Sequence, residues 1–312
     1  MDTPESQTLI DAVDARTKLA GSNKMEILLF SLGTRETFGI NVFKVREVTR
    51  TPPITRTPNM PAGVEGVISL RGNIIPVISL ATFVNIGGAE TSSSETMMVT
   101  EYSRRTQGFL VHDVDRIVRV DWDRVKAPET VLSGHESLIT AITELPDGKL
   151  VSILDVEQVL VSAFGEEAIP DMAQLQSERE HTIFFVDDSM VARKEIAQVL
   201  DKLGVHYHQA NNGQEGWERL QSLAGRAQSE GRELQELVSL ILLDAEMPEM
   251  DGYVLTRHIK NDARFSRIPV VMHSSLSSEA NRAMGKSVGV DAYVAKFDPI
   301  VLADTLKPFL LR

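Results

Sequence analysis

The chain has 312 residues, of which 42% are hydrophobic and 24% charged, and its formal net charge is −12. This length predicts about two domains of an ordinary globular protein. The sequence contains no cysteine, which excludes disulfides and thiolate chemistry and indicates a reducing, cytoplasmic setting. An acidic balance without a basic stripe disfavours nucleic acid as a partner. The lack of a long apolar run or a signal peptide disfavours membrane insertion and secretion.

The first half of the chain is rich in short aliphatic runs. Residues 1–24 are expected to form an N-terminal helical segment, because apolar residues recur at helical spacing between Leu9 and Leu19. Residues 25–165 predict an all-β domain, either barrels or a sandwich, because β-branched runs alternate with Gly, Pro, Asn and Asp. Strands are expected at residues 25–32, 37–42, 66–70, 74–80, 96–102, 108–114, 138–145 and 149–154, with a hairpin turn in "ELPDGKL".

The second half alternates strand and helix patterns. Residues 166–180 are expected to form an acidic linker, since they hold a proline and no apolar run. Residues 181–312 then show five strand–helix units, with strands at 182–188, 205–210, 237–244, 268–273 and 291–296. Helices are expected at 190–204, 213–228, 251–261, 277–289 and 299–310. This order predicts a doubly wound parallel sheet whose site lies at the carboxyl ends of the strands.

Functional side chains follow the strands of this predicted sheet. The first strand ends in Asp187 and Asp188, the third in Asp244, the fourth in Ser274 and the fifth in Lys296. Clustered carboxylates repel one another unless a cation lies between them, and an all-oxygen site suits Mg²⁺. Asp244 is then the candidate nucleophile toward phosphorus, while Lys296 and the Ser274 hydroxyl contact phosphoryl oxygens.

More ordinary explanations remain open for some of these residues. Asp187 and Asp188 also fit the N-cap of the helix that follows them. His206 and His208 share one strand face, but without further ligands nearby they are expected to be surface residues and not half of a zinc site.

Residues 181–312 resemble a response-regulator receiver domain of the CheY type. The matching motifs are the acid pair in "FFVDDS", the box "LLDAEMPEMDG", the serine in "VVMHSS" and the lysine in "YVAK". The resemblance implies that a partner's phosphohistidine phosphorylates Asp244 and that Mg²⁺ binds the three aspartates and the backbone carbonyl of Glu246. It also implies that Ser274 moves toward the phosphoryl group and that Tyr293 changes rotamer in response. One difference is Phe297, which stands where the family usually has a proline.

Residues 25–165 resemble a CheW coupling domain through "FGINVFKVREV" and "GVEGVISLRGNIIPVISL", and the whole chain resembles the CheV type of coupling protein. The resemblance implies a pair of small SH3-like five-stranded barrels without catalytic machinery. It implies binding to the histidine kinase CheA and to chemoreceptor cytoplasmic tips, in receptor arrays at the membrane. Arg71, Val45 and Glu47 fall at the partner-binding positions of the family.

The favoured function is a chemotaxis scaffold that couples receptors to CheA and is controlled by phosphorylation of Asp244, with the receiver catalysing only its own phosphorylation. The alternative is a phosphate sink that drains the kinase, with the first domain serving only for localisation. From the residues alone, Arg71 also fits a solvated hairpin charge and Tyr293 a half-buried strand aromatic. A DNA-binding regulator is disfavoured because the chain ends directly after the last expected helix. We expect the phosphate to act back on the first domain through the acidic linker.

Overall fold

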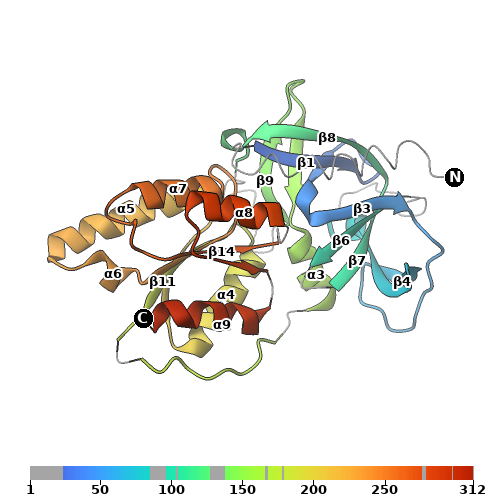
Figure 1. Cartoon of the computed structure of the whole chain (residues 1–312). Helices are drawn as coiled ribbons and strands as arrows, with labels where there is room; N and C mark the ends of the chain where they lie inside the picture. Colours follow the sequence, from blue (N-terminus) through green and yellow to red (C-terminus); the bar gives the residue numbers. More distant parts are fainter. Residues whose placement is uncertain are drawn as a thin grey trace.

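The computed structural model describes residues 24–84, 96–102, 105–126, 138–165, 168–177, 179–275, 279–296 and 298–311. Figure 1 shows two domains side by side. The first contains β1 (Lys24–Ser31), β2 (Thr37–Asn41), η2 (Val42–Lys44), β3 (Val45–Arg50), β4 (Val64–Leu70), β5 (Asn73–Ser79), α2 (Leu80–Val84), β6 (Thr96–Tyr102), β7 (Arg105–Val111), β8 (Asp113–Asp121), η4 (Trp122–Arg124), β9 (Ile139–Glu144), β10 (Leu150–Leu154) and α3 (Val156–Phe164). The second contains β11 (Thr182–Val186), α4 (Met190–Leu203), β12 (His206–Ala210), α5 (Gly213–Glu230), α6 (Leu234–Leu237), β13 (Leu240–Leu243), α7 (Gly252–Asn261), β14 (Val270–Ser274), α8 (Glu279–Val288), β15 (Ala292–Ala295) and α9 (Pro299–Leu310).

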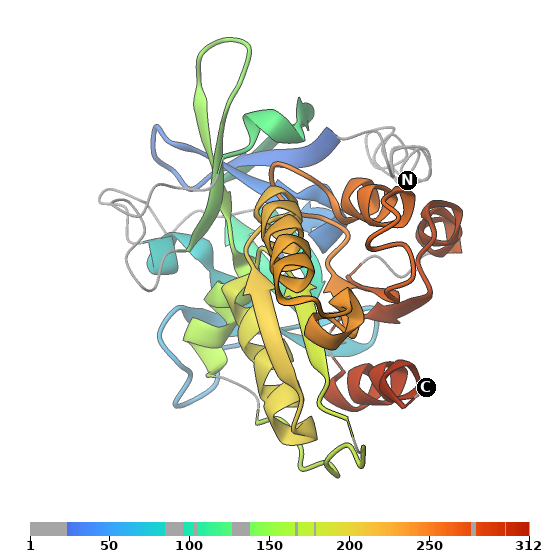
Figure 2. The same cartoon turned by 90° about the vertical axis from the view of Figure 1, so that its left-hand side faces the viewer.

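Two five-stranded sheets form the first domain, with the strand orders β8-β1-β2-β10-β9 and β3-β6-β7-β5-β4. Most neighbouring strands are antiparallel, but β10 pairs with β2 and β5 with β7 in parallel. The hairpin of β9 and β10 projects at the top of Figure 2. Its turn is closed by a 2.9 Å hydrogen bond from the Leu145 amide to the Lys149 carbonyl, and Gly148 has a φ of 82°. The predicted hairpin is therefore confirmed.

Each sheet of the first domain has its own apolar core, and a further core lies between them. In β1, Ile27 and Leu29 face the core around Trp122, whereas Leu28 and Phe30 face the shared core. Burial on both faces explains why this strand is apolar along most of its length, without the alternation of a half-exposed strand. Helix α3 also packs its apolar side on the shared core. The predicted all-β domain is confirmed.

Two strands and two α-helices of the first domain, α2 and α3, are not predicted by the sequence. The strands β3 and β8 lie at the ends of their sheets, where outward-facing charged residues such as Arg46 and Arg116 obscure the strand pattern. The longer of the two helices is α3, whose N-cap Asp155 accepts hydrogen bonds from the amides of Glu157 and Gln158. The helix expected at residues 1–24 lies outside the described residues, except that Lys24 begins β1.

The second domain has a parallel sheet with the strand order β12-β11-β13-β14-β15. Helices α5, α6 and α7 pack on one face of the sheet, and α4 and α9 on the other. Because both faces are covered, all four residues of β13 are buried, which explains its continuous aliphatic sequence. The predicted doubly wound fold is confirmed. Within the described part of the chain, no helix combines the length and the apolar character needed to traverse a bilayer.

Residues 168–177 run beneath the second domain in Figure 1 and are anchored to it. Ile169, Met172 and Leu175 pack on the core next to α4 and α9. Lys202 Nζ lies 2.6 Å from Asp171 Oδ1, and the Leu175 amide donates a 2.9 Å hydrogen bond to the carbonyl of the last residue of α4. This anchor lies where α4 ends, at the edge of the sheet opposite the carboxyl ends of the strands.

Candidate functional site

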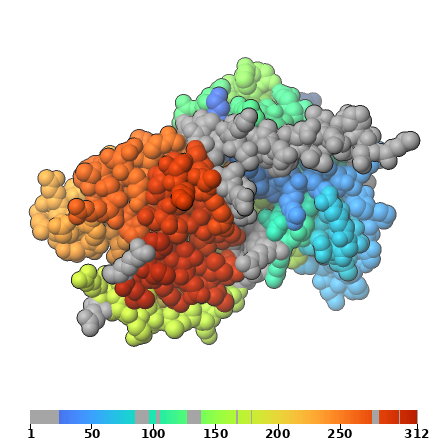
Figure 3. All heavy atoms as spheres, viewed as in Figure 1, coloured from blue at the N-terminus to red at the C-terminus, as the bar shows by residue number. Residues whose placement is uncertain are grey.

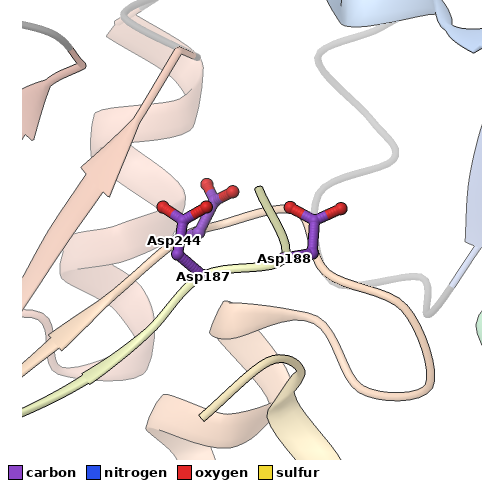
Figure 4. A group of neighbouring side chains, drawn as sticks. All are labelled: Asp187, Asp188 and Asp244. Atoms are coloured by element: carbon purple, nitrogen blue, oxygen red, sulfur yellow. The ribbon is translucent and has the colours of Figure 1, made fainter. Parts of the chain in front are cut away.

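Four charged side chains meet at the carboxyl edge of the parallel sheet. Asp187 and Asp188 follow β11, Asp244 follows β13, and Lys296 follows β15. The three carboxylates each offer an oxygen within 4.8 Å of the others, and Figure 4 shows Asp188 standing beside the overlapping pair. Lys296 Nζ lies 2.7 Å from Oδ2 of both Asp187 and Asp244. The predicted acidic residues and lysine are therefore together in space.

The loop after β13 has a conformation that only particular residues allow. The Asp244 amide donates a 2.9 Å hydrogen bond to the Val186 carbonyl, which keeps the phosphoacceptor candidate in register with β11. A Cβ on Gly252 would lie 2.0 Å from the Asp244 carbonyl oxygen, so a side chain there is excluded. Asp251 caps α7 by accepting a 2.7 Å hydrogen bond from the Val254 amide. The Asp-Gly pair of the sequence thus places the start of α7 directly against the site.

The loop after β11 supplies the N-cap of α4 from a residue other than the two aspartates. Ser189 caps α4, because its hydroxyl accepts a hydrogen bond from the Ala192 amide. Arg193 donates hydrogen bonds of 2.8 and 3.0 Å to the backbone carbonyls of Asp187 and Asp188. These contacts fix the backbone. Asp187 Oδ1 accepts a 3.0 Å hydrogen bond from the Ser189 amide at the start of α4, while Asp187 Oδ2 faces Lys296 in the site.

The electrostatics of the site favour a further cation. Burial raises the pKa of Asp187 to about 7 and that of Asp188 to about 6, and it also raises the pKa of Asp244. Burial would lower the pKa of Lys296, but Asp187 and Asp244 outweigh it and hold that pKa well above its usual range. One ammonium cannot neutralise three carboxylates. An all-oxygen donor set with surplus negative charge fits Mg²⁺.

Two further predicted residues lie beside this cluster. Ser274 ends β14 and is fully buried, and its carbonyl accepts a 3.0 Å hydrogen bond from the Lys296 amide. Tyr293 lies in β15, where burial raises its pKa to about 12 while the hydroxyls of Ser274 and Tyr253 act in the opposite direction. The sequence analysis missed Tyr253. Its place directly after the Asp-Gly pair that ends the motif box is the signal that marks it.

The residues predicted for partner binding lie on the first domain. Arg71 forms an ion pair with Glu47, and its side chain remains 75% exposed in the turn between β4 and β5. Ile74 on the same hairpin is 77% exposed, an apolar side chain that the sequence analysis did not single out. Val45 differs from the expectation, because it is buried in the core between the two sheets. A partner would therefore reach Glu47 and Arg71 but not the Val45 side chain.

Residues of the first domain also reach the acidic edge, which the sequence analysis did not foresee. Lys44 Nζ lies 3.1 Å from Glu157 Oε1 and is attracted by the carboxylate of Asp188. Glu157 is in turn attracted by Lys296. Nothing in the sequence marks these residues, because their role depends on how the two domains pack.

Comparisons with known proteins agree with this architecture. Residues 26–164 match the CheW-like domain family and residues 183–307 match the response regulator receiver domain family. The fold and the acidic site thus define a two-domain signalling protein in which a CheW-like domain precedes a receiver domain. From here the first domain is called the CheW-like domain and the second the receiver domain.

Two curated relatives align with the chain across both domains. The chain is 34% identical to chemotaxis protein CheV3 of Helicobacter pylori over 265 residues, which cover 84% of each protein. It is 28% identical to CheV1 of the same organism, with 96% of this chain and 97% of that protein covered. The solved scaffolding protein TtCheW of Thermoanaerobacter tengcongensis is 30% identical, covers 46% of this chain and 91% of its own, and has a TM-score of 0.41. The chain belongs to the CheV family of chemotaxis proteins.

Proposed function

We propose that this protein is a cytoplasmic chemotaxis scaffold that couples chemoreceptor tips to the histidine kinase CheA, and that Mg²⁺-dependent phosphorylation of Asp244 controls the coupling. One observation carries the phosphorylation part of the proposal. Lys296 lies 2.7 Å from both Asp187 and Asp244 at the end of a parallel sheet. Membership of a family of chemotaxis proteins that join a CheW-like domain to a receiver domain supports the coupling part.

The chemistry assigned to the receiver domain is phosphoryl transfer to Asp244. A carboxylate oxygen of Asp244 forms a bond to phosphorus, the bond from phosphorus to the donor's histidine nitrogen breaks, and the imidazole leaves with a proton from solvent. Lys296 and the Ser274 hydroxyl contact phosphoryl oxygens. Asp187, Asp188, Asp244 and the backbone carbonyl of Glu246 would hold Mg²⁺, which neutralises charge on the transferring group. The receiver domain then catalyses only its own phosphorylation.

The exposed hairpin of the CheW-like domain is the proposed contact for kinase and receptors. Arg71 offers a guanidinium for a partner carboxylate, and Ile74 adds apolar surface beside it. Glu47 pairs with Arg71 in the free protein and so keeps the guanidinium in one orientation. We place the protein at receptor arrays on this basis, without nucleic acid as a partner.

A pull-down with receptor tips and CheA tests the proposal. The Asp244→Ala chain should bind as the wild type does but lose the change in binding or kinase activity that a phosphodonor causes. A response to phosphodonor that persists in Asp244→Ala would contradict the proposal. The phosphate sink would be favoured instead if phosphotransfer and hydrolysis were rapid and the coupling of receptors to CheA were the same before and after phosphorylation of Asp244.

A further inference from the structure

The CheW-like domain presents a small group of residues to the acidic edge of the receiver domain. We call them the docking residues: Asn41, Phe43, Lys44, Trp122 and Glu157. They come from three separate segments of the sequence, namely the end of β2 with η2, η4, and the first turn of α3, which meet only in the fold. Figures 1 and 3 show the two domains next to each other, and α3 lies against α4.

Three of the docking residues hold the receiver loop that follows Asp244. Phe43 packs on the apolar core of the receiver domain. The carbonyl of Trp122 accepts a 3.3 Å hydrogen bond from the Glu249 amide. The Asn41 side chain hydrogen-bonds the carboxyl of Glu246, which is two residues from the phosphoacceptor. The contact therefore covers the loop that begins at the proposed phosphoacceptor.

The other two docking residues, Lys44 and Glu157, carry opposite charges. Burial would lower the pKa of Lys44, but the carboxylates of Glu157 and Asp188 outweigh it and raise that pKa. Burial would raise the pKa of Glu157, but the ammonium groups of Lys44 and Lys296 lower it. Two attractions thus cross the domain boundary, one from Lys44 to Asp188 and one from Glu157 to Lys296.

The docked arrangement leaves little access to the reacting atoms. Asp244 is 6% exposed, Ser274 is 0% exposed, and the Lys296 side chain is 3% exposed. A phosphodonor must bring its phosphorus to the Asp244 carboxylate with room for the leaving group. Lys44 lies close enough to Asp244 for its ammonium to lower the pKa of that carboxyl, so the approach of a donor requires the docked domain to move away.

We propose that the docked CheW-like domain is a closed state of the phosphorylation site, which must open for phosphoryl transfer and which the phosphoryl group then keeps from re-forming. The inference rests on the proposed function and adds its regulation. A phosphoryl group on Asp244 competes with Glu157 for Lys296. With Mg²⁺ held at Asp188, the ammonium of Lys44 would be repelled, so both cross-domain attractions would be lost in the loaded site.

One buried atom of the contact opposes the closed state. Glu157 Oε2 is buried and receives no hydrogen bond from the described residues. Burying an unsatisfied polar atom costs free energy, and opening returns this oxygen to water. The two cross-domain attractions therefore work against the cost of burying this oxygen, and a change of charge at the site can reverse the balance.

The contact gives a shorter route to the partner surface than the linker expected from the sequence. The linker is anchored to the receiver at Leu175 and Asp171, on the edge opposite the site. The docking segment η2, by contrast, continues directly into β3, which carries Glu47 and its ion pair with Arg71. Release of η2 thus acts on the strand next to the proposed partner-binding residues.

The test compares two variants of the full chain that change charge in opposite directions. Lys44→Met and Glu157→Gln preserve side-chain size, and each removes one cross-domain attraction. Both should raise the initial rate of Asp244 phosphorylation by acetyl phosphate and Mg²⁺ about fivefold, because both increase the open population. Arg46→Met is the control, since its half-exposed pair with Glu101 lies within the CheW-like domain, and its rate should equal the wild-type rate.

The outcomes separate this inference from the proposed function. If local charge alone governed the reaction, Lys44→Met would slow phosphorylation and Glu157→Gln would speed it. Rates that change in opposite directions in the two variants, or that do not change, would overturn the inference. No phosphate on Asp244 in the wild type would overturn the proposed function as well. Backbone hydrogen exchange gives a readout without turnover. Amides of residues 42–45 should exchange faster when beryllofluoride and Mg²⁺ load the site, and unchanged protection would refute the opening.

Discussion

Replacing Lys296 by methionine removes the ammonium that lies 2.7 Å from both Asp187 and Asp244 while keeping most of the side-chain volume. The lysine side chain is 3% exposed, so its loss leaves buried carboxylates without their counter-charge. Breaking such a buried pair costs about 3–5 kcal/mol when the remaining charges stay ionised. We expect a loss of about 3 kcal/mol in the free energy of unfolding at pH 8.

The same variant should lose less stability at lower pH. Burial raises the pKa of Asp187 to about 7 in the folded protein, above its unfolded value, and losing Lys296 removes an effect that lowers it. A carboxyl whose folded pKa is raised binds its proton more tightly in the folded state, so stability falls as pH rises between the unfolded and folded pKa values. The slope is about 1.4 kcal/mol per pH unit for one proton. The deficit of Lys296→Met should therefore shrink to about 1 kcal/mol near pH 6.

Urea titrations followed by tryptophan fluorescence at pH 6 and pH 8, with and without Mg²⁺, measure both effects. Mg²⁺ at one hundred times its dissociation constant should raise the free energy of unfolding of the variant by about 2.7 kcal/mol. Lys307→Met is the control, because Lys307 forms an i,i+3 pair with Asp304 on the surface of α9 and should change stability by less than about 0.5 kcal/mol. A deficit that is equal at both pH values, together with a variant that Mg²⁺ does not stabilise, would refute this electrostatic account.

Three further predictions concern the same two surfaces. Mg²⁺ affinity, measured by titration calorimetry, should weaken as pH falls from 8 to 5, because Asp187 with its pKa of about 7 takes up a proton that the ion must displace; a flat profile would contradict the pKa assignment. Gly252→Ala should slow phosphorylation and lower the free energy of unfolding by about 2 kcal/mol or more, because its Cβ would lie 2.0 Å from the Asp244 carbonyl oxygen. Gly225→Ala is the control, since a Cβ there would meet nothing within 4 Å, and it should stabilise α5 by about 0.5–1 kcal/mol in denaturant titrations. Arg71→Ala should weaken binding to CheA or receptor tips in a pull-down while leaving the melting temperature unchanged, and wild-type binding would remove the arginine from the proposed surface.

The receiver domain could be predicted from the sequence because each of its signals is local. A buried parallel strand has a continuous aliphatic sequence, and the residue at its carboxyl end must lie at the functional edge of the sheet. Asp187, Asp244 and Lys296 are each placed by their own strand, so their meeting follows from strand order alone. The edge strands β3 and β8 were harder to predict because one face of each carries charged residues.

The domain contact could not be predicted because no local pattern encodes it. Lys44 and Glu157 resemble ordinary charged residues of a short 3₁₀ helix and of the first turn of a helix. Only the packing of the two domains brings them to the acidic edge, where the buried carboxylate of Glu157 is attracted by Lys296. The helix α3 itself was missed since its nine residues are mostly apolar and resemble a strand.

Kinase activity in reconstituted complexes of receptor, CheA and this protein tests the central claim most directly. Acetyl phosphate and Mg²⁺ should change the kinase activity in complexes with the wild-type chain and leave it unchanged in complexes with Asp244→Ala, although both chains join the complexes equally. An equal response in the two complexes would contradict control of coupling through Asp244.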